Sequence, residues 1–285
     1  MLLKNLINNI SEKNKKIIIT GLSINSKQVK KGNIFFAIKG NKKNGERYIN
    51  DAINRGASVI ISSKNLKVKN KKILVIKKKD IRNFLGEVSS KFYTLKPNNI
   101  IAVTGTNGKT SVADLFYQIL SVNNVPAASI GTLGVKYKNK IIKTGLTSPD
   151  TIAIHKYLYI LKKKKIDNVI IEASSHGLDQ HRLHHINFKA GIFTNFSQDH
   201  LDYHKNMKSY LKAKLILFRK ILKKNSNIIT DKNIKEFGIL NKIARIRMLR
   251  IIEINKIIKN ISLYEKNKFK IKNLAMAIAT AKYVV

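Results

Sequence analysis

The sequence has no cysteine among its 285 residues, which excludes disulfide bonds and thiolate metal sites. Long apolar runs are also missing, because none approaches the roughly 18 residues that a membrane-spanning helix needs. Lysine and asparagine interrupt the apolar stretch Met1–Ile10, so it does not have the pattern of a signal peptide. These absences predict a cytoplasmic protein with no membrane partner.

Acidic residues are scarce: Asp and Glu number 16 against 56 Lys and Arg, and the formal net charge is +40. One interpretation is a protein that binds nucleic acid or an anionic membrane. The other is a compositional bias toward Lys, Asn and Ile. The lysines are spread along the chain, and aromatic residues do not alternate with them as base stacking requires. We therefore favour the bias and predict no specific nucleic-acid partner, although the charge can attract a small polyanion.

Length and composition permit two domains with separate cores, since 44% of the residues are apolar. In the first region, short apolar runs between turn residues predict strands, and two longer segments predict helices. The expected strands are Ile17–Thr20, Ile34–Ile38, Val59–Ser62 and Ile73–Ile76, and the expected helices are Tyr48–Arg55 and Lys77–Leu95. Pro97 marks a break, so we place the domains at residues 1–97 and 98–285.

In the second region, strand patterns alternate with helix patterns. The expected strands are Ile100–Val103, Ala127–Ile130, Val169–Glu172, Gly191–Phe193 and Ile228–Thr230. The expected helices run from the turn after the first strand to about Asn123, and over Ile152–Lys163, Ser209–Leu222 and Asn273–Val284. This alternation is typical of an α/β domain whose mainly parallel sheet is covered by helices on both faces.

The segment Ile100–Thr110 predicts a phosphate-binding loop of the P-loop ATPase kind, because a buried strand leads through a glycine-rich turn into a helix. Backbone N–H groups at such a turn can face phosphate oxygens. Lys109 would reach the β- and γ-phosphates of ATP, and the hydroxyl of Thr110 would bind Mg²⁺. Val103 stands where the common pattern has its first glycine, so this loop is shorter. The residues expected to hold ATP are Thr104, Gly105, Thr106, Asn107, Gly108, Lys109 and Thr110.

Glu172 lies near the carboxyl end of its expected strand, the edge at which open α/β sheets bind ligands. Its carboxylate is therefore placed to hold Mg²⁺, a cation that prefers oxygen ligands. We expect the following residues to form a loop that carries Ser174, Ser175 and His176, with Gln180 and Arg182 available for an anionic or amide-bearing substrate. Phe193–His204 is rich in His and Asp, which indicates a metal or phosphate environment.

Four segments together resemble the Mur ligases, and most closely the MurE type. These segments are Thr104–Thr110, Glu172–Leu178, Thr194–His204 and Tyr210–Lys214. The N-terminal residues Asn25–Lys27, Gly32–Ala37, Gly40 and Gly45 resemble the UDP-binding domain of that family. The similarity covers nearly the whole chain. It implies an N-terminal UDP-substrate-binding α/β domain followed by a P-loop ATPase-like central domain.

The resemblance implies an ATP-dependent ligase of peptidoglycan-precursor synthesis. Such an enzyme activates the terminal carboxylate of UDP-N-acetylmuramoyl-L-alanyl-D-glutamate as an acyl phosphate, and the amino group of a diamino acid then displaces phosphate. The sequence does not choose between meso-diaminopimelate and L-lysine, and meso-diaminopimelate is the prior expectation. We expect a monomer.

By the same resemblance, Lys109, Glu172, His200 and Lys214 are the expected catalytic residues. Thr110, Glu172, His200 and Lys214 are expected around the metals, with Lys214 as a carbamate, because an ammonium group would repel Mg²⁺ whereas its carbamate is an anion. Asn195 is expected to bind the nucleotide. The expected substrate-binding residues are Ser26, Thr147, Ser148, Ser175, Gln180 and Arg182.

Three positions depart from the family pattern. Asn25 and Lys27 replace an aspartate and an arginine, and lysine does not present the forked donors that a bidentate contact needs. Ser148 replaces a threonine but keeps the hydroxyl. The resemblance also implies a third, C-terminal domain that selects the amino acid, and the sequence stops about where that domain should begin. We therefore expect an incomplete enzyme. The alternatives are a non-catalytic nucleotide- or nucleic-acid-binding module and a ligase similar to folylpolyglutamate synthetases.

Overall fold

The computed structural model describes residues 1–40, 44–66, 68, 70, 72–261 and 265–284. The chain divides into two compact units, Met1–Thr94 and Leu95–Val285. Within the described ranges, every helix falls short of the length or hydropathy that a bilayer span requires.

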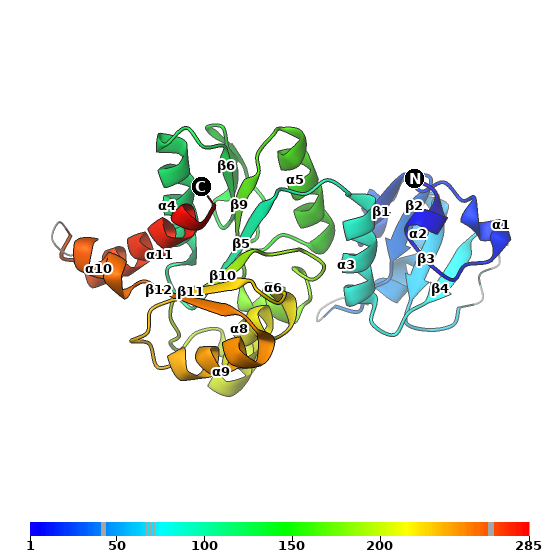
Figure 1. The fold of residues 1–285 in the computed structure, drawn as a ribbon. Helices are drawn as coiled ribbons and strands as arrows, with labels where there is room; N and C mark the ends of the chain where they lie inside the picture. Colours follow the sequence, from blue (N-terminus) through cyan, green and yellow to red (C-terminus); the bar gives the residue numbers. More distant parts are fainter. Residues whose placement is uncertain (41–43, 67, 69, 71, 262–264, 285) are drawn as a thin grey trace. The chain divides into compact units, whose positions relative to one another are not determined.

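The first unit is built on a four-stranded parallel sheet in the order β1-β2-β3-β4 (Figure 1). Its strands are β1 (Gly21–Ser23), β2 (Asn33–Phe36), β3 (Ala57–Ser62) and β4 (Leu74–Lys77), and its longer helices are α2 (Ile49–Asn54) and α3 (Ile81–Phe92). Short turns of helix cover Leu3–Asn5, Glu12–Lys15, Ser26–Gln28 and Gly45–Tyr48. One core lies under α2, where Ile49 and Ala52 pack with Phe35 and Ile60.

Two expectations for this unit are wrong. The expected strand Ile17–Thr20 does not join the sheet, because its backbone pairs with the first residues of the chain: Leu3 N donates to Ile17 O, and Ile19 N to Met1 O. The expected helix Lys77–Leu95 is shorter, since Asp80 caps it by accepting a hydrogen bond from Asn83 N at 3.0 Å. The residues before Asp80 belong to β4 and its connection.

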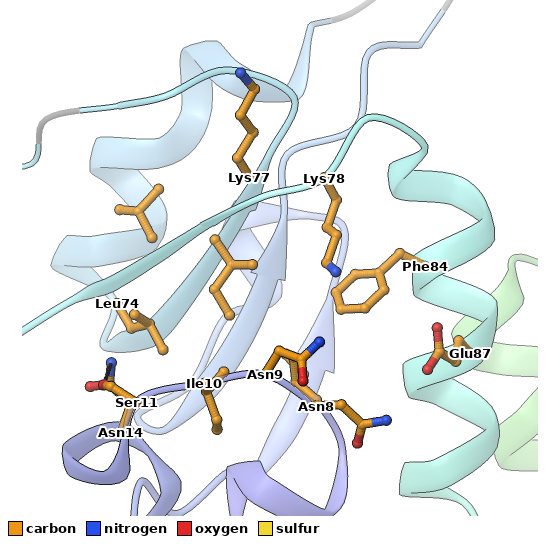
Figure 2. Close-up of a pocket in the computed structure, with 13 residues that line it drawn as sticks. Asn8, Asn9, Ile10, Ser11, Asn14, Leu74, Lys77, Lys78, Phe84 and Glu87 are labelled. Carbon is orange, nitrogen blue, oxygen red and sulfur yellow. Dashed lines mark hydrogen bonds between the residues drawn. The ribbon is translucent and has the colours of Figure 1, made fainter.

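A cavity of about 480 Å³ lies in this unit beside the edge strand β4 (Figure 2). Its walls are the segment Ile7–Ser11, strand β4 and two residues of α3, Phe84 and Glu87. Figure 2 shows Lys78 pointing toward Phe84, and the ammonium group lies 4.5 Å from the centre of that ring. None of the described residues that line this cavity is a predicted site residue.

The second unit is an eight-stranded sheet in the order β12-β11-β10-β5-β9-β6-β7-β8 (Figure 1). Its strands are β5 (Asn99–Thr104), β6 (Ala127–Gly131), β7 (Gly134–Tyr137), β8 (Lys140–Ile142), β9 (Asn168–Glu172), β10 (Ala190–Phe193), β11 (Asn227–Thr230) and β12 (Arg250–Glu253). Six strands are parallel, and β7 and β8 add an antiparallel edge. The mainly parallel sheet predicted for this region is confirmed.

Helices cover both faces of this sheet, and the alternating side chains of β5 explain why. The helices are α4 (Lys109–Val122), α5 (Thr151–Lys163), α6 (Ser175–Asp179), α7 (Leu201–His204), α8 (Met207–Ile216), α9 (Phe237–Arg247), α10 (Asn255–Ile261) and α11 (Lys268–Val284). Ile101 and Val103 face a core shared with α4 and α11. Ile100 and Ala102 face the opposite core, shared with α5, α8 and α9.

Several details of this unit differ from expectation. The loop expected at Ser174–His176 is wrong, because Ser174 caps α6 by accepting a hydrogen bond from Gly177 N at 3.0 Å. The helix expected over Ser209–Leu222 is interrupted, since α8 gives way to a π-helical turn at Leu217–Ile221. Besides α6, the elements of this unit that the sequence patterns did not predict are β7, β8, β12, α7, α9 and α10.

Candidate functional site

The phosphate loop connects β5 to α4, and two glycines shape it. Gly105 has φ +148° and Gly108 has φ +86°, conformations that side-chain-bearing residues rarely adopt. A Cβ atom at Gly105 would collide with the hydroxyl of Thr194. Both glycines are therefore required by the backbone, and Gly105 also by the close approach of a neighbouring segment.

That neighbouring segment follows β10, the strand beside β5. Thr194 Oγ1 donates to Asn107 O at 2.6 Å, and Asn107 N donates to Asn195 Oδ1 at 2.9 Å. Thr106 N donates to the backbone oxygen of Asn195 at 2.9 Å. In the structure Asn195, predicted to bind the nucleotide, fixes the shape of the loop.

Two lysine ammonium groups converge on the backbone oxygens of this loop. Lys109 Nζ donates to Gly105 O at 3.0 Å and to Thr106 O at 2.8 Å. Lys214 Nζ, from α8, donates to Gly105 O at 2.6 Å and is fully buried over the ring of Tyr210. Burial lowers the pKa of Lys109. Burial, with the adjacent charge of Lys109, lowers the pKa of Lys214 to about 7.

Glu172 lies at the carboxyl end of β9 with its carboxylate against the start of α4. Thr110 Oγ1 donates to Glu172 Oε2 at 2.9 Å, and Thr132 N donates to Glu172 Oε1 at 2.8 Å. Gly131 leaves space for this carboxylate, because a Cβ atom there would overlap it. The structure thus brings together Thr110 and Glu172, and adds Thr132. The only sequence signal for Thr132 is its place just after the strand Ala127–Ile130.

His200 lies apart from this pair, in an aromatic cluster next to Lys214. Its ring is 5.1 Å from that of His176 and 5.9 Å from that of Tyr210, measured between centroids. The hydroxyl of Tyr210 donates to Thr106 Oγ1 at 3.3 Å, which ties the cluster to the loop. In the described part of the chain, no three His, Asp or Glu side chains converge in the manner of a metal site.

Five of the predicted substrate-binding residues lie near the backbone of Glu172. Ser148 Oγ donates to Glu172 O at 2.7 Å, so its hydroxyl supports the fold. Arg182 donates to Ser148 O at 2.6 Å and to Gln180 Oε1 at 2.7 Å. Thr132 Oγ1 donates to Thr147 Oγ1 at 3.1 Å. The hydroxyl of Ser175 is buried without a hydrogen-bond partner among the described residues.

Ser26 belongs to the first unit, where it begins a short 3-10 helix and is buried. Asn25 caps that turn by accepting a hydrogen bond from Lys27 N at 3.1 Å. Hydrogen bonding to Ser26 is the main reason that the pKa of Asp51 lies below its usual value. The hydroxyl of Ser26 is thus held by α2.

Asn273, on α11, is a residue that the sequence analysis did not single out. Its Oδ1 atom lies 2.5 Å from the position that a Cβ atom at Gly108 would take. The amide therefore borders the loop just before Lys109. The feature of the sequence that could have indicated this position is the alanine-rich pattern of α11, which allows the helix to pack closely along α4.

Comparisons with protein families give two matches. The family described as "Mur ligase middle domain" matches residues 103–254, and the family described as "Mur ligase family, catalytic domain" matches residues 18–93. The first match covers more than half of the chain and includes the phosphate loop, Glu172 and Lys214.

Named relatives are similar over most of the chain. A UDP-N-acetylmuramoyl-L-alanyl-D-glutamate–2,6-diaminopimelate ligase of Rickettsia montanensis is 42% identical over 84% of this chain and 50% of its own length. A solved structure of a ligase with that name superposes with a TM-score of 0.82 at 23% identity, over 100% of this chain and 64% of the other. A folylpolyglutamate synthase of Mycobacterium tuberculosis gives 0.53 at 12% identity, over 71% and 58%. The chain spans about half the length of the curated relatives it matches.

Proposed function

Because the chain belongs to the Mur ligase family, we propose that it acts in the ATP-dependent addition of a diamino acid to UDP-N-acetylmuramoyl-L-alanyl-D-glutamate. The proposed diamino acid is 2,6-diaminopimelate, which the names of the relatives at 40–44% identity contain, and we take the meso isomer as the expected form. The observation that carries the proposal is the pairing of Thr110 with Glu172 at the end of a loop whose backbone oxygens accept hydrogen bonds from Lys109 and from the buried Lys214. Residues 1–97 bind the UDP-substrate and residues 98–285 bind ATP.

The loop is suited to the triphosphate of ATP. Its glycines keep the backbone open, and α4 begins at Lys109, so the positive end of the helix dipole faces the loop. The proposed contacts are Thr104, Gly105, Thr106, Asn107, Gly108, Lys109 and Thr110, with Asn195 as the support of the loop and Asn273 beside it. Lys109 leaves its two backbone acceptors to bind the γ-phosphate, where its charge offsets the negative charge that develops during transfer.

The residues beside the loop fit Mg²⁺, which Mur ligases use together with ATP. Glu172 supplies a carboxylate whose two oxygens accept hydrogen bonds from the hydroxyls of Thr110 and Thr132 and from Thr132 N, and Thr110 supplies the adjacent hydroxyl. Oxygen donors of this kind are what Mg²⁺ prefers, and the ion would neutralise phosphate charge. We propose His200 as a further ligand, reached from the aromatic cluster.

Lys214 is proposed to act as a carbamate. Only an unprotonated amine adds CO₂, and a pKa lowered to about 7 leaves a large neutral fraction at neutral pH. The carbamate would replace a buried cation by an anion, which removes the repulsion between Lys214 and Lys109. It would then offer two oxygens near Thr106 and the metal.

The muramoyl-dipeptide is proposed to contact Thr147, Ser175, Gln180 and Arg182, and the UDP group to contact Ser26. The unpartnered hydroxyl of Ser175 supports this placement, because a buried polar group needs a hydrogen-bond partner. Ser148 contributes indirectly, by holding Glu172 O and presenting its own backbone oxygen to Arg182. The protein is proposed to be a cytoplasmic monomer.

Binding measurements with the 285-residue chain test the proposal. Isothermal titration calorimetry should detect ADP·Mg²⁺, a non-hydrolysable ATP analogue with Mg²⁺ and UDP-N-acetylmuramoyl dipeptide, and Lys109→Met should weaken binding of the ATP analogue by at least about tenfold. Titration with duplex DNA at about 0.15 M salt tests the competing hypothesis of a nucleic-acid-binding module, which the net charge of +40 favours. DNA binding that persists at this salt, together with no binding of either small molecule, would reject the ligase.

A further inference from the structure

Asp231 follows directly after β11 and carries a fully buried carboxylate. Its Oδ2 atom forms an ion pair of 2.7 Å with Lys272 Nζ. Its Oδ1 atom accepts hydrogen bonds from Asn233 N at 2.9 Å and from Asn255 Nδ2 at 3.5 Å. A buried carboxylate is costly unless it is paired, so Asp231 favours a position of α11 that keeps the ammonium group of Lys272 near it, although the Lys272 side chain is 41% exposed.

Lys272 stands immediately before Asn273, the residue whose amide borders Gly108 of the phosphate loop. The first residues of α11, at 268–270, are exposed, and only Ile271 among residues 268–273 is buried. The start of α11 is held by the side chain of Asn267, which accepts hydrogen bonds from Phe269 N and Lys270 N, by contacts with α10, by Ile271 and by the ion pair with Asp231. Farther along, Ala275 and Ala279 pack in the core that α11 shares with α4.

We propose that the ion pair between Asp231 and Lys272 positions Asn273 against the phosphate loop, and so tunes the affinity of this chain for its nucleotide. This inference rests on the proposed binding of ATP at the loop. Asp231 and Lys272 act as positioning residues that do not touch the nucleotide themselves. The sheet, through the end of β11, thereby sets where the amide of α11 lies relative to Gly108.

The geometry favours this role over a general contribution to stability. The core of α11 begins at Ala275, so the helix stays packed on α4 without the ion pair. What the pair adds is a fixed position for the first two turns, and Asn273 lies at their end. Loss of the pair should therefore change nucleotide affinity and leave binding of the UDP-substrate unchanged, because none of the proposed contacts of that substrate lies on α11 or β11.

The test measures the Kd of ADP in Mg²⁺ by isothermal titration calorimetry on the 285-residue chain. Lys272→Met should raise this Kd by about tenfold, the size expected for a coupled pair. Lys272→Arg keeps the charge and should stay within about threefold of the wild type. Lys270→Met is the matched control, because it removes an exposed lysine of the same helix. It should leave the Kd within about twofold, as for a surface charge.

A double variant, Asp231→Asn with Lys272→Met, guards against misfolding, because it leaves no unpaired buried charge. It should show the same loss of ADP affinity as Lys272→Met alone and the wild-type Kd for UDP-N-acetylmuramoyl dipeptide. Equal ADP affinities for Lys272→Met and Lys270→Met, or wild-type affinity in the double variant, would overturn the inference. A wild-type chain that does not bind ADP would overturn the proposed function and this inference with it.

Discussion

The buried amine of Lys214 gives the sharpest prediction, a carbamate whose amount follows pH. With a pKa of about 7 in place of 10.5, about half of this amine is neutral at pH 7 and about nine-tenths at pH 8. An ordinary lysine would be neutral in only about one molecule in 3,000 at pH 7. Uptake of CO₂ at low bicarbonate and neutral pH should therefore favour Lys214 over the other lysines, including Lys96, whose pKa burial lowers only to about 8.

The assay is ¹³C NMR of the 285-residue chain with ¹³C-labelled bicarbonate at pH 6, 7 and 8. A carbamate signal should be present at pH 7, grow toward pH 8 and be missing from Lys214→Met. Lys212→Met, which removes an exposed lysine of the same helix, should retain it. Lys96→Met identifies any second signal at pH 8, because burial lowers the pKa of Lys96 to about 8. Identical spectra for Lys214→Met and the wild type at pH 7 and 8 would refute the reasoning.

The same pKa has a consequence for stability with a definite sign. Between about pH 7 and 10.5 the unfolded chain holds a proton on Lys214 that the folded chain has released, so stability rises with pH across this window. The free energy of unfolding rises by about 5 kcal/mol over the whole window, and the destabilisation by the buried ammonium group is fully present below pH 7. Chemical denaturation at pH 7 and 10, without bicarbonate, should show a smaller rise for Lys214→Met than for Lys212→Met. Equal slopes would contradict the assigned pKa.

Three further predictions follow. Gly105→Ala places a methyl group against Thr194 and forces a strained φ, so the Kd of ADP by calorimetry should rise by at least about tenfold, with wild-type affinity contradicting the loop geometry. Glu172→Gln should reduce the Mg²⁺ dependence of ADP binding, because an amide is a weaker ligand than a carboxylate; an unchanged Mg²⁺ titration would exclude Glu172 from the metal site. Burial lowers the pKa of His155 to about 3, so stability should fall as the pH drops from about 6.5 toward 3, by up to about 5 kcal/mol, and denaturation of His155→Leu should show a flatter profile.

The local rules of the sequence were sufficient for the phosphate loop. Strand β5, the glycine turn and helix α4 are adjacent in the chain, and both glycines adopt conformations that few other residues tolerate. The parallel order of the sheet also follows from the alternation of strands and helices. The prediction of a sheet strand at Ile17–Thr20 was wrong because this segment pairs with the start of the chain, and no local pattern encodes that pairing.

The sequence patterns did not predict the edge strands whose stability depends on a neighbouring strand. The hairpin of β7 and β8 is short and lysine-rich, and it forms by extending β6 at the edge of the sheet. Strand β12 has the same character, since β11 provides its register. β7 alternates Val135 and Tyr137 with Lys136, but all three strands have only three or four residues, and such short patterns become strands only beside an existing sheet.

By itself, the sequence determined the residue types of the site: a loop with Lys109 and Thr110, a carboxylate at Glu172, and a lysine at position 214. Only the tertiary structure decided how they act on one another. It buried Lys214 against Gly105 O, set Thr110 against Glu172, and placed Asn273 beside Gly108. The reason is physical: hydrogen bonds and charge shifts depend on separations of a few ångströms and on exclusion of water. Those arise where strand ends and helices far apart in the chain meet at one edge of the sheet.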